Sequence, residues 1–159
     1  ILTGNISDIK QNNQRVLGAS IQTDVFDSIG VRAEGHLNRS NNEQTLEWVF
    51  GLDYQWDNQL NLSGEWFHHG AKAPTSNLPY QASEYLALGL SYPFTPLLNG
   101  SLNLIRNIDD KSMLLTTYLN YSLSNESTLN ISILLPKGES FSEFNAYPQS
   151  LGAEYQIYF

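Results

Sequence analysis

The chain has no cysteine, few charged residues and no long hydrophobic run. Charged side chains make up 15% of its 159 residues, against about 25% in typical soluble domains. The absence of cysteine excludes disulfide frameworks and cysteine-ligated zinc sites. No run of about 18 apolar residues occurs, which excludes a transmembrane helix. This absence does not exclude a membrane β-barrel, because the apolar residues of such a barrel alternate with polar ones.

Basic residues are especially scarce. The chain has 8 Lys and Arg against 16 Asp and Glu, giving a formal net charge of -8, which argues against a nucleic-acid partner. A soluble β-protein usually carries Lys and Glu on its outer face and its sheet edges. The chain also lacks an initiator Met and a signal peptide, so Ile1 is expected to be a processed end or a break within a longer chain.

Apolar residues recur with period two along nearly the whole chain, which predicts β-strands and no helix. In the last strand, Leu151, Ala153 and Tyr155 share one face, while Gly152 and Glu154 share the other. The same alternation predicts nine strands of about the length that spans a bilayer when tilted. They cover residues 17–25, 29–37, 46–56, 60–67, 86–94, 98–104, 115–123, 129–135 and 151–159, and residues 1–4 are the possible end of a tenth.

The predicted connections alternate in length. The longer ones are residues 5–14, 38–44, 68–83, 107–112 and 136–150, and the short ones are centred on 27–28, 57–58, 94–96 and 125–126. Tight turns at one end and longer loops at the other are typical of outer-membrane barrels, whose tight turns are periplasmic. The pattern therefore predicts a periplasmic C-terminus and extracellular long loops.

Aromatic residues fall near the ends of the apolar faces. Trp48 and Trp66 are expected toward the extracellular rim, and the others toward the periplasmic rim: Tyr54, Trp56, Tyr92, Phe94, Tyr121 and Phe159. Two such belts are typical of the aromatic girdles of membrane barrels. The alternative is that these are ordinary core aromatics of a soluble sheet.

The C-terminal sequence LGAEYQIYF resembles the closing signature of Gram-negative outer-membrane β-barrel proteins of the porin-like superfamily. That resemblance implies that the barrel-assembly machinery recognises Leu151, Ala153, Tyr155, Ile157 and Phe159. The segments 47–56, 65–70 and 107–112 are also similar to strands and a loop in such proteins. The resemblance covers most of the chain but matches no substrate-defining motif. It implies an outer-membrane location with the lipid bilayer as partner.

The predicted fold is an all-β, antiparallel up-and-down transmembrane β-barrel formed by residues 1–159 as one domain. Bacterial single-chain barrels close on an even number of strands. Nine strands and part of a tenth therefore favour the C-terminal segment of a larger barrel over a complete ten-stranded one. The remaining strands would belong to that larger barrel or to a partner protein.

The predicted polar face carries nine ionisable candidates for the lining of a lumen. They are Asp24, Arg32, Glu34, His36, Glu47, Asp53, Glu65, His69 and Glu154. In a water-filled lumen they would set the local potential, with a mild preference for cations. Alternatively they form ion pairs that brace the barrel, for example Arg32 beside Glu34, or Glu47 across the sheet.

No cofactor, metal or catalytic residue is predicted. His68 and His69 should point to opposite faces of a strand, so they cannot chelate one ion together with His36. The pair Asp109–Asp110 supplies too few oxygens for calcium and is expected to be solvated loop charge.

A serine nucleophile at position 20 or 63, with His36 or His69 as its base, matches no known spacing, so no enzyme is expected.

We expect a porin-like channel for passive passage of ions or small hydrophilic solutes. The alternatives are a scaffold barrel that sheathes or anchors a redox or secretion partner or presents receptor loops, and a soluble ligand-binding barrel with its apolar face inward.

Overall fold

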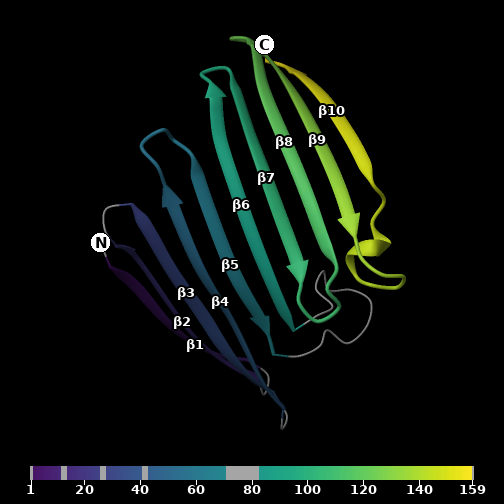
Figure 1. Cartoon of the computed structure of the whole chain (residues 1–159). Helices are drawn as coiled ribbons and strands as arrows, with labels where there is room; N and C mark the ends of the chain where they lie inside the picture. The colour runs from purple at the N-terminus through teal and green to yellow at the C-terminus, as the bar shows by residue number, and fades with distance from the viewer. Residues whose placement is uncertain (1, 12–13, 26–27, 41–42, 71–82, 159) are drawn as a thin grey trace.

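The computed structural model describes residues 2–11, 14–25, 28–40, 43–70 and 83–158, and the strands within these ranges form one antiparallel sheet (Figure 1). Its strands follow one another in chain order from β1 to β10, so each pairs with its sequence neighbours. They are β1 Thr3–Gln11, β2 Gln14–Val25, β3 Ile29–Ser40, β4 Glu43–Gln55, β5 Asn61–His69, β6 Glu84–Thr95, β7 Leu98–Asn107, β8 Met113–Ser124, β9 Ser127–Lys137 and β10 Ser150–Ile157. The all-β up-and-down architecture predicted from the alternation is confirmed.

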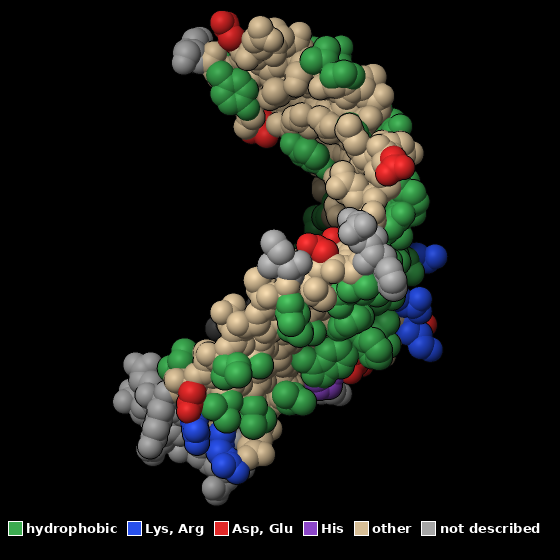
Figure 2. Space-filling view, turned by 90° about the vertical axis from the view of Figure 1, so that its left-hand side faces the viewer, with side chains coloured by type: hydrophobic (Ala, Val, Ile, Leu, Met, Phe, Trp, Pro, Cys, Tyr) green, Lys and Arg blue, Asp and Glu red, His purple; other side chains and the backbone are tan. Residues whose placement is uncertain are grey.

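The sheet is strongly curved but open. Figure 2 shows the molecule as a crescent with a hollow on one side. Strands β1 and β10 are its two edges, and each pairs with a single neighbour. Closure into a barrel, expected from the sequence, is therefore absent from these ten strands.

The strand register separates the side chains onto two faces. Residues that are Cα partners on neighbouring antiparallel strands point to the same side of a sheet. Leu52, Gly64 and Leu88 form one lateral row on what we call the apolar face, while Asp53 and Ser63 lie on the opposite, polar face. The apolar side chains are largely uncovered, Leu88 being 44% exposed. Hydrophobic side chains follow the convex side of the crescent in Figure 2.

The small buried core of the described residues lies at one end of the polar face. Tyr85 and Phe144 are the buried hydrophobic residues there, and Phe67 and Leu114 pack against them. Phe144 belongs to the short 3-10 helix η1, Phe144–Ala146, in the connection between β9 and β10. We call this connection, residues 138–149, the strap. Among the described residues there is no helix that is both long and apolar enough to cross a membrane.

The prediction of a loop over residues 5–14 is wrong, because β1 extends to Gln11 and pairs with β2 along its whole length. Ile6 and Ile9 are three residues apart, so they fall on opposite faces of the strand. The period-two pattern is therefore broken in a segment that is nevertheless a strand.

The loop predicted over residues 38–44 is also wrong. The pairing of β3 with β4 continues through Asn38–Thr45 to Ser40–Glu43. Polar residues at the strand ends, beyond the apolar band, extend the ladder without contributing to the hydrophobic pattern. As a result, the alternation of long and short connections holds only from β5 onward.

Candidate functional site

The polar face brings all nine predicted ionisable candidates to one side of the sheet. The register places Arg32 opposite Gly51 and Gly51 opposite Glu65, and it aligns His36 with Glu47 and Glu47 with His69. Asp24 and Asp53 are both register partners of Gly30, from the strands on either side of it. Glu34 is the register partner of Ser20, and Glu154 that of Asn130. The prediction that these residues share a face is confirmed, and their role in lining a lumen stays a prediction.

Arg32 connects three neighbouring strands. Its guanidinium pairs with Glu65 of β5, and its Nη1 lies 3.5 Å from Oδ1 of Asp53 on β4. The side chain lies over Gly51, where a Cβ would stand 2.7 Å from Nε of Arg32. Glycine at position 51 therefore makes room for the bridge. Arg32 pairs across the sheet and not with Glu34 on its own strand, the partner suggested by the sequence.

A second cross-strand group contains two histidines and one carboxylate. Oε2 of Glu47 lies 2.8 Å from Nε2 of His36, and Oε1 of Glu47 lies 2.5 Å from Nδ1 of His69. Glu47 thus stands between its neighbours on β3 and β5, as the bracing interpretation predicted. No group of three or more metal-ligating side chains within the described ranges has a geometry that could hold a metal ion.

The other half of the polar face is braced by amides. Asn120 donates to Asn130 at 2.6 Å, and Asn130 donates to Oε2 of Glu154 at 3.4 Å, which links β8, β9 and β10. Gln156 donates to the other oxygen of Glu154. Asp24 and Glu34 are exposed to solvent. Seven of the nine candidates therefore have cross-strand polar contacts, while Asp24 and Glu34 carry exposed charge.

The strap is fixed to the polar face by the buried carboxylate of Glu143. The Tyr85 hydroxyl donates to Oε2 of Glu143 at 2.7 Å, and Nδ2 of Asn107 donates to the same oxygen at 2.8 Å. The neighbouring ring of Phe144 packs on Tyr85 with a centroid distance of 6.4 Å. None of these four residues was a predicted site residue, although Asn107, Glu143 and Phe144 lay in predicted loops.

The turn between β7 and β8 also contacts the strap. Oδ1 of Asn107 accepts the backbone N–H groups of Asp109 and Asp110. Asp110 in turn accepts the N–H of Ser112 at 2.8 Å and that of Glu143 at 2.7 Å. Oδ2 of Asp109 accepts the N–H of Ser83. The pair is loop charge with access to solvent, as predicted, since Asp109 is exposed and Asp110 only partly buried. Both carboxylates also accept hydrogen bonds from backbone groups of other segments, which the sequence did not predict.

The hydrogen bonds to Asp110 have an electrostatic consequence. Burial raises the pKa of its carboxyl, but the bonds from the Ser112 hydroxyl and from the backbone N–H groups of Glu143 and Ser112 lower the pKa more. The net pKa lies below the ordinary value of 3.8. Since the folded pKa is depressed, the charged form of Asp110 stabilises the strap above pH 3.8, and this contribution is lost as the pH falls below that value.

We therefore expect the strap to detach progressively in acid. Pepsin cleavage within residues 138–149 should accelerate as the pH falls from about 4 toward about 2, relative to cleavage elsewhere in the chain. Asp110→Asn removes the titrating group, so its strap should be cut faster at pH 4 and show a flatter dependence on pH. An identical pH dependence in the wild type and in Asp110→Asn would contradict the role given to Asp110.

On the apolar face, an aromatic group lies near the same end of the sheet. Trp48 stacks on His68 with a centroid distance of 5.6 Å and meets Trp66 edge to face. The Glu84 carboxylate lies 2.6 Å from Nδ1 of His68 and accepts from the Trp66 indole at 2.5 Å. His68 and His69 thus lie on opposite faces, as predicted.

The remaining girdle candidates lie toward the opposite end of the apolar face. Tyr54 meets Trp56 edge to face, as Tyr92 meets Phe94, and Tyr121 pairs with Leu98 in register. Of the predicted assembly residues, four lie on the apolar face of β10, and Phe159 lies outside the described residues: the four are Leu151, Ala153, Tyr155 and Ile157.

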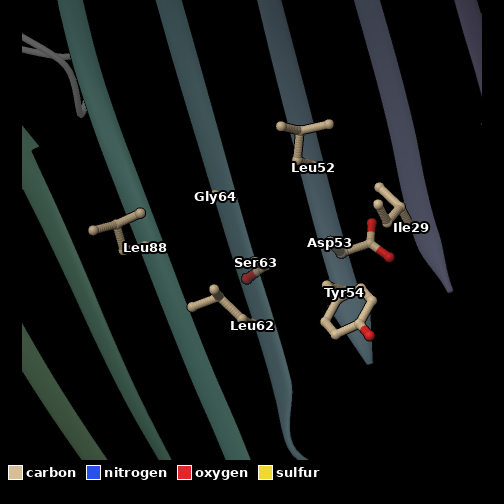
Figure 3. A pocket seen from close by; sticks show the side chains of 8 residues that line it. All are labelled: Ile29, Leu52, Asp53, Tyr54, Leu62, Ser63, Gly64 and Leu88. Atoms are coloured by element: carbon tan, nitrogen blue, oxygen red, sulfur yellow. The ribbon is translucent and has the colours of Figure 1, made fainter. Parts of the chain in front are cut away.

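A shallow groove of 330 Å³ interrupts the apolar face at Gly64. Figure 3 shows Leu52, Leu62 and Leu88 around this glycine, with Tyr54 on the same strand as Leu52 and Ile29 on the next strand beyond it. A Cβ at Gly64 would only touch Leu88, at 3.5 Å. The groove exists because one position in a row of leucines has no side chain.

Comparisons with known proteins identify no relative. No protein-family model matches the chain. No curated protein and no solved structure matches it either.

Proposed function

We propose that this sheet is part of the wall of an outer-membrane β-barrel through which ions or small hydrophilic solutes pass passively. The observation that carries the proposal is the separation of exposed apolar and polar side chains onto opposite faces from β2 to β10. Large uncovered apolar surfaces mark contacts with a membrane or a partner. Strands of 8 to 13 residues are also of a suitable length to cross a bilayer at a tilt.

The curvature of the sheet supports contact with lipid on its convex side and with water on its concave side. Apolar side chains follow the convex side of the crescent (Figure 2). Side chains on the polar face are crowded, since Arg32 reaches β5 from β3 and a Cβ at Gly30 would lie 2.4 Å from the Asp53 carboxylate. A soluble ligand-binding barrel would instead place its apolar side chains on the concave side.

Closure requires strands beyond β1 and β10. In a hydrocarbon environment each unpaired backbone N–H or C=O costs several kcal/mol, so a spanning sheet has no open edges. We infer that further strands, from the same protein or a partner, pair with these two edges and complete the barrel. The barrel-assembly machinery would recognise the apolar face of β10 during this process.

A scaffold barrel is the second candidate, and the observation that favours it is the strap, which covers part of the polar face. Conductance separates the two candidates. The intact protein, extracted from its membrane in detergent and reconstituted in planar bilayers, should show stepwise ionic conductance if it is a channel. A stably inserted but silent protein would support the scaffold and contradict the channel.

We expect the channel to prefer cations, because the exposed charges at Asp24 and Glu34 are acidic. Glu34→Gln should reduce the cation-to-anion permeability ratio by roughly 1.5-fold at 0.1 M salt, and by less at 1 M, where the Debye length falls to about 3 Å. Glu126→Gln is the matched control, since this exposed glutamate lies in the turn after β8. Equal reversal potentials for Glu34→Gln and the wild type would contradict a lumen position for Glu34.

A further inference from the structure

The junction between the strap and the sheet combines strong contacts with an unmet polar group. The Glu143 side chain belongs to a residue only 6% exposed, and its Oε2 accepts two hydrogen bonds. Its Oε1 is also buried and accepts none from the described residues. A buried acceptor without a partner opposes the closed arrangement, and water would satisfy it if the strap moved away.

Backbone strain is concentrated at the same junction. Lys111 and Phe141 have left-handed backbone angles, with φ of 64° and 70°. Lys111 belongs to the turn that contacts the strap, and Phe141 to the tight turn closed by the bond from Ser142 N–H to Glu139 O. The third such non-glycine residue in the described ranges, Gln59, lies in the β4–β5 turn. Strained residues tend to cluster at elements that switch between arrangements.

Nothing in the strand ladder depends on the strap. The pairing of β9 with β10 begins at Ser150 opposite Leu134, so residues 138–149 lie outside the ladder. The strap is held by the Glu143 bonds, by Phe144 on Tyr85, and by backbone contacts to Asp110 and Ser112. Its release would leave all ten strands paired.

We propose that the strap is a lid that leaves the polar face as one unit, with Glu143 as its latch on Tyr85 and Asn107. Only the consequence of opening rests on the proposed function: in a channel, an open lid would widen the passage along the polar face. The closed lid is stabilised by the shared Oε2 acceptor and by Phe144. It is opposed by the unmet Oε1 and the two strained residues, and this balance makes opening accessible.

The absence of cysteine makes the lid testable with introduced thiols. Ser142 is 8% exposed in the strap, so the thiol of Ser142→Cys should react slowly with a maleimide while the lid is closed. Ser140→Cys places a thiol at an exposed position of the same strap and gives the unprotected rate. Ser127→Cys, at a residue 7% exposed at the start of β9, reports opening of the sheet itself.

The latch is weakened by Tyr85→Phe, which removes the hydroxyl donor and keeps the ring. In the Ser142→Cys background we expect about a tenfold faster reaction, because one hydrogen bond to a carboxylate is lost. Tyr118→Phe, at an exposed tyrosine of the polar face on β8, should leave the rate unchanged. Glu143→Ala is the second variant, and it should accelerate the reaction at least as much.

The rates of thiol reaction test the lid proposal without any measurement of conductance. Faster reaction of the Ser142→Cys thiol in both latch variants, with Ser127→Cys still protected, supports the lid. Unchanged rates overturn it, and so does equal acceleration at Ser127→Cys, because the whole sheet would then be opening. Conductance is measured separately: a silent wild type would overturn the proposed channel while the thiol rates still decide the lid.

Discussion

Replacing Leu88 by arginine should keep the protein out of the membrane, whereas the same replacement at Ala87 should not. Leu88 lies in the middle of β6 on the apolar face, in register with Gly64 and Leu104. An arginine facing lipid at the bilayer midplane costs about 2–4 kcal/mol. That cost is a large fraction of the stability of a typical domain, about 5–15 kcal/mol.

Ala87 is the matched control because it is the next residue on the same strand and faces the opposite way. It lies beside Glu65 in register, so a new arginine there would meet water and a carboxylate. The measurement is the fraction of protein that floats with lipid vesicles after assembly from urea. If Leu88→Arg inserts as well as the wild type, or if both arginine variants fail equally, the apolar face is not the lipid-contacting face.

The alternation of residues was sufficient to predict the sheet and its two faces. In β4, Trp48 and Leu52 alternate with Glu47 and Asp53, and the register with β3 and β5 preserves that separation. A shift of one residue would move every side chain to the opposite face. The period-two alternation alone was therefore enough to predict which of the candidate residues share a face.

The ends of the strands could not be predicted in the same way. β1 has isoleucines on opposite faces, and the ends of β3 and β4 are polar on both. Such segments are strands because a neighbouring strand satisfies their backbone groups, which is a property of the pairing and not of their own composition. Closure into a barrel was predicted from the sequence, but the ten strands form an open sheet, in which β1 and β10 each pair with one neighbour.

The strap was missed, although the sequence contained a sign of it. Phe67, Tyr85 and Leu114 are apolar residues at polar-face positions, and they contradict the alternation near one end of the sheet. A local break of this kind indicates that something packs on the polar face there. The sequence did not reveal that the packing residues are Glu143 and Phe144, because these two lie in an irregular segment.

Asn107→Ala should release the strap and destabilise the β7–β8 turn together. Asn107 is 2% exposed, and its amide oxygen accepts two backbone N–H groups while its amide nitrogen donates to Glu143. Alanine leaves those N–H groups without an acceptor and the buried carboxylate with one donor fewer. Each such loss costs about 1–3 kcal/mol, so we expect about 3 kcal/mol in total after partial hydration.

Hydrogen exchange of the strap amides measures this effect, and protection at Glu143 and Phe144 should fall by about 100-fold, since 1.4 kcal/mol corresponds to a factor of ten. Asn103→Ala removes an exposed asparagine from the same face of β7 and should change little. Asn107→Asp separates the two roles, because it keeps an oxygen for the turn but places a second carboxylate against Glu143. The aspartate variant should therefore expose the strap while the turn amides of Asp109 and Asp110 stay protected, and loss of protection at both sites would contradict that division.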